Sequence, residues 1–84
     1  MFWVYVLQSD VTGRRYTGSC EDLEKRLHQH NAGYSPATRH GVPWRLVHRE
    51  CLETRSAAMK RERFLKSGHG RAEVDRLLSG GSPG

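Results

Sequence analysis

The first eighteen residues constrain the fold most, because they predict a β-hairpin. Phe2–Gln8 (FWVYVLQ) is rich in aromatic and β-branched residues, which favour a strand. Ser9–Gly13 contains Ser, Asp, Thr and Gly, which are typical of turns. Arg14–Gly18 (RRYTG) follows as a short second strand, which we expect to end at Gly18. Two strands joined this closely pair antiparallel, so the chain begins with a sheet that later elements have to cover.

The rest of the chain predicts three helices and one more strand. A capping pattern at Ser19 and Asp22 begins a helix over about residues 20–31, and Gly33 stands where that helix should stop. The later elements are a loop over 33–43, a strand over 44–50, a helix from Thr54 or Ser56 to Gly68, a helix over 71–78 and a flexible tail over 79–84. The 84 residues allow one domain, which we place at 1–78. We therefore expect an α+β fold, with a small three-stranded antiparallel sheet, flanking helices and the order ββαβαα.

Positive charge is the clearest compositional feature. Lys and Arg number 14 against 9 Asp and Glu, which gives a formal net charge of +5. Lysine occurs only at Lys25, Lys60 and Lys66, so most of the basic residues are arginines. Arginine binds phosphate through two parallel hydrogen bonds, and a small arginine-rich domain therefore suggests a polyanion partner such as nucleic acid. A GC-rich genome or surface Arg–Glu pairs would also raise the arginine content, so charge alone leaves this partner open.

Several classes of protein are disfavoured by the composition. The apolar runs are far shorter than the ~20 residues of a membrane span, and the apolar start of the chain is too short for a signal peptide. Cys20 and Cys51 are too few for a disulfide scaffold or a four-cysteine zinc site. A zinc site that adds His28, His30 and His40 is also disfavoured, since His28 and His30 point in different directions on a helix. These features predict a cytoplasmic protein with reduced thiols and no membrane partner.

Two polar residues occupy positions beside the predicted core of the first helix. Leu23 and Leu27 define its buried stripe. His30 falls about 20° from Leu23 around the helix, and Arg26 falls about 60° from Leu23 on the side away from Leu27. Arg26 reaching out to solvent and His30 packing as a half-buried residue would explain these positions without any function.

The second helix and the hairpin carry further candidates. Glu62 projects one turn after Ala58, at the edge of the apolar face, and Arg61 projects nearer to its centre. A carboxylate in that place binds a metal, pairs with an arginine or points into solvent. Tyr5 and Tyr16 lie on the two hairpin strands, where cross-strand packing is the simplest role.

The same residues match the motifs of a known nuclease family. Its two tripeptides correspond to Trp3-Val4-Tyr5 and Tyr16-Thr17-Gly18, its arginine–histidine helix to Lys25–Asn31 (KRLHQHN), and its glutamate helix to Ala58–Glu62. The chain thus resembles the GIY-YIG nuclease domain over residues 2–78, and it is most similar to the small stand-alone bacterial proteins of the UPF0213 and YhbQ type. The first tripeptide departs from Gly-Ile-Tyr, and no asparagine follows Asn31.

This resemblance implies a metal-dependent endonuclease that hydrolyses phosphodiester bonds in nucleic acid, in DNA more than in RNA, with little sequence specificity and a role in DNA repair or recombination. The implied catalytic residues are Tyr5, Tyr16, Arg26, His30 and Glu62, with Glu62 as the protein ligand of Mg²⁺ or Mn²⁺. Either Tyr5 or His30 would activate the attacking water. The implied substrate contacts are Gly18, Arg14, Arg15, Lys25, Arg39 and His40. The alternative is a basic nucleic-acid-binding module with the same fold and no catalysis.

Overall fold

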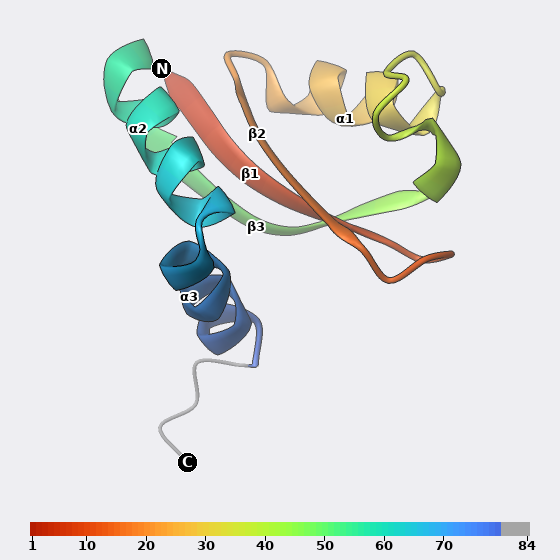
Figure 1. Cartoon of the computed structure of the whole chain (residues 1–84). Helices are drawn as coiled ribbons and strands as arrows, with labels where there is room; N and C mark the ends of the chain where they lie inside the picture. The colour runs from red at the N-terminus through yellow and green to blue at the C-terminus, as the bar shows by residue number, and fades with distance from the viewer. Residues whose placement is uncertain (80–84) are drawn as a thin grey trace.

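Residues 1–79, which the structure describes, form the predicted series of strands and helices. The computed structural model contains β1 (Phe2–Ser9), β2 (Arg15–Cys20), α1 (Leu23–Asn31), the 3₁₀ helix η1 (Arg39–Gly41), β3 (Trp44–Leu52), α2 (Arg55–Lys66) and α3 (Gly68–Leu78) (Figure 1). The α+β class, the three-stranded antiparallel sheet and the order ββαβαα are therefore confirmed. Of the predicted tail, Ser79 closes α3 by donating its N–H to the Asp75 carbonyl, and 80–84 lie outside the described residues. Within 1–79, none of the helices has the length and apolar character that crossing a membrane requires.

Strand β1 is the centre of the sheet and is buried on both faces. The strand order is β2-β1-β3, and both neighbours are antiparallel to β1. Val4 and Val6 pack against α2 and α3, whereas Tyr5 and Leu7 pack with Leu23 of α1 and with the start of β3. Figure 1 shows the same arrangement, with α2 and α3 on one side of the sheet and α1 on the other. A strand covered on both sides needs an apolar run without alternation, which is the pattern of β1.

The turn from β2 to α1 differs from the prediction. Strand β2 does not end at Gly18 but continues to Cys20, because its last residues still pair with β1. Helix α1 therefore begins only after Asp22, whose carboxylate accepts a hydrogen bond from the Lys25 N–H at 3.1 Å. The predicted first cap, Ser19, is a strand residue and serves the candidate site instead.

The other ends of the elements shift by a few residues. Strand β3 extends to Leu52. Thr54, one of the two predicted caps, begins α2 by accepting a backbone hydrogen bond at 3.0 Å. Helix α3 begins at Gly68 and not at Arg71, because the Ser67 hydroxyl caps it with a backbone hydrogen bond at 3.2 Å.

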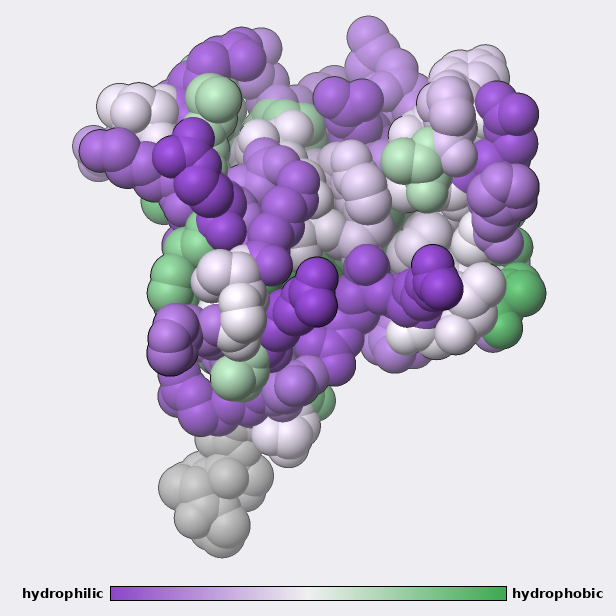
Figure 2. Space-filling model, in the orientation of Figure 1, coloured by the Kyte–Doolittle hydropathy of each residue, from purple (hydrophilic) through white to green (hydrophobic). Residues whose placement is uncertain are grey.

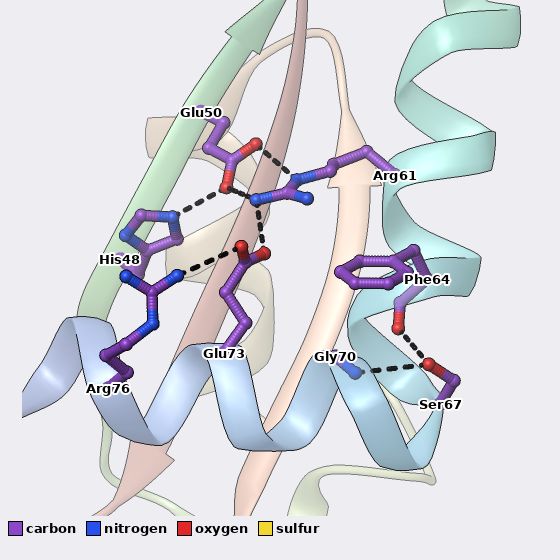
Figure 3. Close-up of polar contacts among 8 residues, drawn as sticks. All are labelled: His48, Glu50, Arg61, Phe64, Ser67, Gly70, Glu73 and Arg76. Carbon is purple, nitrogen blue, oxygen red and sulfur yellow. Dashed lines mark hydrogen bonds and ion pairs between the residues drawn. The ribbon is translucent and has the colours of Figure 1, made fainter.

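An ion-pair network explains why Arg61 lies near the centre of the apolar face of α2. Its guanidinium makes two hydrogen bonds to Glu50 of β3, at 2.7 and 2.9 Å, and an ion pair with Glu73 of α3 at 2.8 Å (Figure 3). His48 Nε2 lies 2.8 Å from the same Glu50 carboxylate. The hydrogen bonds from Arg61 hold the pKa of Glu50 below its ordinary value. The network joins α2 to β3 and α3, and so fixes how α2 lies on the sheet.

We expect Arg61→Met to lower the free energy of unfolding by about 2 kcal/mol at pH 7, since it leaves two largely covered carboxylates without their cation. The folded pKa of Glu50 lies below its unfolded value of 4.5, so this stabilisation is present above that pH and is lost as pH falls through the folded pKa. Urea unfolding over a pH series measures both effects. Arg76→Gln removes an exposed arginine 3.4 Å from Glu73, and as the matched control it should change little. An equal loss for Arg61→Met at neutral and acidic pH would contradict the ionic role.

Candidate active site

A buried chain of hydrogen bonds connects three elements on the α1 side of the sheet. Tyr5 points from the middle of β1, and its hydroxyl oxygen lies 3.0 Å from His30 Nε2 near the end of α1. The other ring nitrogen, Nδ1, lies 2.8 Å from Thr38 Oγ1 in the loop before η1. All three residues are at most 2% exposed. The predicted place of His30 on the buried stripe of α1 is thereby confirmed.

The partners of His30 indicate which of its nitrogens carries the proton. We assign the proton to Nδ1, because the Thr38 hydroxyl can then accept it at 2.8 Å and donate its own hydrogen to the Ser35 carbonyl 3.5 Å away. Nε2 then accepts the hydrogen bond from the Tyr5 O–H. Burial, and after it the charge of Arg26, holds the pKa of His30 below its ordinary value, and burial raises the pKa of Tyr5. At neutral pH the pair is therefore a neutral phenol donating to a neutral imidazole.

Tyr16 and Gly18 of β2 complete this side of the site. The ring centroid of Tyr16 lies 5.0 Å from that of His30 and 6.4 Å from that of Tyr5, so the two hairpin tyrosines are neighbours. Gly18 stands opposite Tyr5 in the strand pairing and is buried. A side chain there would place its Cβ 2.6 Å from the Tyr5 hydroxyl oxygen. Glycine is needed at this position to make room for Tyr5, and its contact with substrate stays a prediction.

Gly18→Ala should displace the Tyr5 hydroxyl, because the added methyl carbon would also lie 2.8 Å from Cζ of the same ring. We expect the free energy of unfolding to fall by about 1–3 kcal/mol, which is the usual effect of overpacking a core. Gly68→Ala is the matched control, since nothing lies within 4 Å of a Cβ at that position. Chemical denaturation compares the variants with the parent protein. If Gly18→Ala were as stable as Gly68→Ala, space at Gly18 would not be limiting.

Glu62 lies on the opposite side of the sheet from Tyr5. Its Oε1 accepts a hydrogen bond from Ser19 Oγ at 2.7 Å, and its Oε2 pairs with Lys66 Nζ at 2.7 Å. Ser19 stands opposite Val4 in the strand pairing, so both point toward α2, whereas Tyr5 points toward α1. Burial raises the pKa of Glu62, but the hydrogen bonds from Lys66 and Ser19 outweigh it and hold the pKa below its ordinary value. The carboxylate is therefore ionised at neutral pH.

The two sides of the site meet at β2, an edge strand of the sheet, beside an open cavity of about 350 Å³. We call it the β2-edge cavity. Three basic, two acidic and three uncharged residues line it: Lys25, Arg26, Arg55, Glu21, Asp22, Ser19, Cys20 and Gln29. Ser19 connects the cavity to Glu62, and the positive charge of exposed Arg26 acts on Tyr5 by opposing the rise in its pKa. An anion in this cavity would lie near Arg26 and near Ser19, whose hydroxyl donates to Glu62.

Tyr5 connects the five predicted catalytic residues, because it lies beside His30 and its pKa responds to Tyr16, Arg26 and Glu62. Tyr5, Tyr16 and His30 contact one another on the α1 side of the sheet. Arg26 of α1 lines an open cavity together with His30, and the charges of Arg26 and of Glu62 from α2 act on the pKa of Tyr5 in opposite directions.

The predicted substrate contacts other than Gly18 fall in three places. Lys25 lines the β2-edge cavity. Arg14 and Arg15 lie at the other end of β2, where both line a second cavity. Arg39 and His40 are exposed in η1 and line neither of these cavities. Lys25 thus shares a cavity with Arg26, and Arg14 and Arg15 share theirs with Tyr16.

Sequence reasoning missed two hydroxyl groups that hold the site together. Thr38 accepts the second hydrogen bond of His30, and Ser19 donates to Glu62. A buried histidine needs a hydrogen-bond partner for each ring nitrogen, so the predicted burial of His30 implies two partners. Nothing local in the sequence names Thr38 as that partner, because eight residues of helix end and loop separate it from His30.

Comparisons with known proteins identify the family. The family model of the GIY-YIG catalytic domain matches residues 1–74. A UPF0213 protein of Haloquadratum walsbyi is 46% identical over 67 residues, which cover 77% of this chain and 73% of the relative. A UPF0213 protein of Syntrophus aciditrophicus is 40% identical over 79 residues, which cover 90% of this chain and 87% of the relative. The solution NMR structure of a UPF0213 protein of Bacillus halodurans has a TM-score of 0.56 and 30% identity, and the match covers 92% of this chain and 85% of that one. The chain therefore belongs to the GIY-YIG catalytic domain family, with UPF0213 proteins among its relatives, as the resemblance predicted.

Proposed function

We propose that the protein is a divalent-metal-dependent endonuclease that hydrolyses phosphodiester bonds in DNA. The observation that carries this proposal is the buried hydrogen bond of 3.0 Å between the Tyr5 hydroxyl and His30 Nε2. A neutral imidazole that already accepts a hydrogen bond from a phenol is ready to take the phenol's proton. Membership of a family described as a catalytic domain supports the same conclusion.

Tyr5 and His30 act together as the base in this proposal. The Tyr5 oxygen takes a proton from the attacking water while its own proton passes to His30 Nε2. The imidazolium that forms keeps its Nδ1–H on Thr38 Oγ1, 2.8 Å away. Burial raises the pKa of Tyr5 and disfavours a lasting phenolate, and the transfer to His30 avoids one. The two candidates for the base thus become two parts of one proton relay.

Arg26 and Glu62 supply the charge at the β2-edge cavity. Arg26 would donate charged hydrogen bonds to a non-bridging oxygen of the scissile phosphate. Glu62 is ionised, and a single carboxylate is enough to hold a Mg²⁺ or Mn²⁺ ion that keeps most of its water. A bound ion would neutralise charge on the phosphoryl oxygens and stabilise the leaving oxygen.

The candidate contacts imply little sequence specificity. Three of the six predicted contacts are arginines and a fourth is Lys25, and contacts of these residues to phosphate position a nucleic acid without reading its bases. Hydrophilic residues cover most of the face of the molecule seen in Figure 2. A nuclease that recognises backbone would suit DNA repair or recombination, in which substrates differ in structure more than in sequence.

Cleavage assays on supercoiled plasmid, branched duplex and single-stranded DNA, each with Mg²⁺ or Mn²⁺, test the proposal. We expect nicked or cleaved products that disappear when EDTA is added. RNA strands of the same sequence distinguish the two nucleic acids. Binding to these substrates without cleavage under any of the conditions would contradict the nuclease and favour the binding module.

A further inference from the structure

A second open cavity, of about 690 Å³, lies between the β1–β2 hairpin and the helices α2 and α3. We call it the hairpin cavity. Most of its polar lining is charged and consists of Arg14, Arg15, Lys66, Arg71 and Asp75. Its floor is apolar, because the buried residues Val6, Leu65 and Val74 form it. The proposed chemistry at the β2-edge cavity does not use this space.

The charge of the hairpin cavity favours an anion. Its lining carries four cations and one carboxylate, a net charge of 4 − 1 = +3. Arg15 pairs with Asp75, the one carboxylate present. Among residues 1–79, Arg14 and Arg71 pair with no acidic side chain. The forked donors of these exposed arginines fit phosphate oxygens.

The hairpin cavity and Glu62 lie on the same side of the sheet. Arg15, Thr17 and Ser19 alternate along β2 and point toward α2 and α3. Arg15 and Thr17 line the cavity, and Ser19 donates to Glu62. From Arg15 to Ser19 the strand rises about 13 Å, which is the axial rise of about four nucleotides along one strand of duplex DNA. Lys66 connects the hairpin cavity to Glu62, because it lines the cavity and pairs with the Glu62 carboxylate.

We propose that the hairpin cavity binds the phosphate backbone of the DNA about four nucleotides from the scissile phosphate, with Arg14, Lys66 and Arg71 as its contacts. The proposal rests on the proposed function and adds to it a path for the strand along β2. It also assigns substrate binding to Lys66 and Arg71, which the sequence did not single out. Because the contacts are to phosphates, they strengthen binding to every sequence equally.

Binding of a fluorescein-labelled DNA duplex to the metal-free protein, followed by fluorescence anisotropy over a series of NaCl concentrations, tests this site. We expect the double variant Arg14→Gln/Arg71→Gln to bind at least ~10-fold more weakly at low salt. The slope of log K against log[NaCl] should fall in magnitude by about two, one unit for each lost phosphate contact. Lys60→Gln/Arg76→Gln removes the same charge from exposed positions on α2 and α3 outside the cavity, and is the matched control. Its affinity should fall less than ~3-fold.

Three outcomes would overturn the site. Equal losses in the two double variants, with DNA cleavage by the parent protein intact, would show that only net charge matters and would leave the proposed function standing. A labelled mononucleotide that binds as tightly as the duplex and loses affinity in the cavity variant would indicate a small phosphate ligand in place of a strand. Failure of the parent protein to bind any DNA would overturn both proposals.

Discussion

Glu62→Gln should lower the rate of metal-dependent DNA cleavage at least ~10²-fold and leave the fold intact. The substitution removes the single negative charge that the proposed ion needs. The amide oxygen of glutamine can still accept the hydrogen bond that Ser19 now gives to Oε1 at 2.7 Å. The other lost contact, with half-exposed Lys66, is a surface pair and is worth at most about 1 kcal/mol. Single-turnover cleavage at several Mg²⁺ and Mn²⁺ concentrations measures the effect.

Glu53→Gln is the matched control for this experiment, because Glu53 is exposed between β3 and α2 and carries the same charge. Its cleavage rate should stay within ~2-fold of the parent protein. Without metal, Glu62→Gln should bind DNA at least as tightly as the parent, since it removes a negative charge from the surface that faces phosphate. Cleavage by Glu62→Gln at the parent rate would show that Glu62 does not hold the ion.

The order of the strands and helices was predictable from sequence, because turn, cap and stop residues determine the ends of each element within a few positions. The turn at Ser9–Gly13, the cap at Thr54 and the stop at Gly33, where φ is 80°, all lie where the sequence predicts them. The start of α1 was not predictable in the same way. Ser19 and Asp22 are both good caps, and the pairing of Ser19 with distant β1 decides between them.

The two faces of the sheet could not be assigned from sequence, because β1 is apolar at every position from Trp3 to Leu7. Alternation marks the faces of a strand only when one face meets water. The sequence therefore predicted which residues are candidates for the site. It did not predict that Tyr5 and Glu62 come from opposite sides of the sheet. Arg61 was unexplained for a similar reason, since its partners Glu50 and Glu73 belong to other elements.

The surroundings of His30 depend on contacts that span the loop before β3. Its burial followed from the stripe of α1, but its partner Thr38 is placed by Trp44, whose Nε1–H donates to the Thr38 carbonyl at 2.6 Å. Asn31 in turn accepts from the Trp44 N–H at 2.6 Å and donates to the Trp44 carbonyl at 3.0 Å. No local sequence pattern predicts a loop that such contacts hold in place. The structure was therefore needed to identify Thr38 as the hydrogen-bond acceptor of His30 Nδ1.

Tyr5→Phe should lower the cleavage rate by about 10²–10⁴-fold, because it removes the oxygen through which the proton passes to His30. The ring still fills the core, and the lost hydrogen bond to Nε2 lowers stability by only about 1–2 kcal/mol. Tyr34→Phe is the matched control, since Tyr34 is 71% exposed and should cleave at the parent rate. Cleavage by Tyr5→Phe near the parent rate would remove Tyr5 from the reaction.

The pH dependence of cleavage distinguishes a relay from a tyrosine that acts alone. The relay needs a neutral His30, whose pKa lies below 6.5, so the parent rate should rise with pH through that pKa and be level at neutral pH. The residual rate of Tyr5→Phe should lack this step, because His30 no longer receives the proton. A phenolate acting without His30 would behave differently, since burial raises the pKa of Tyr5 above 10. A parent rate that climbs steadily through pH 9, with no step in the acidic range, would therefore contradict the relay and leave Tyr5 as the sole base.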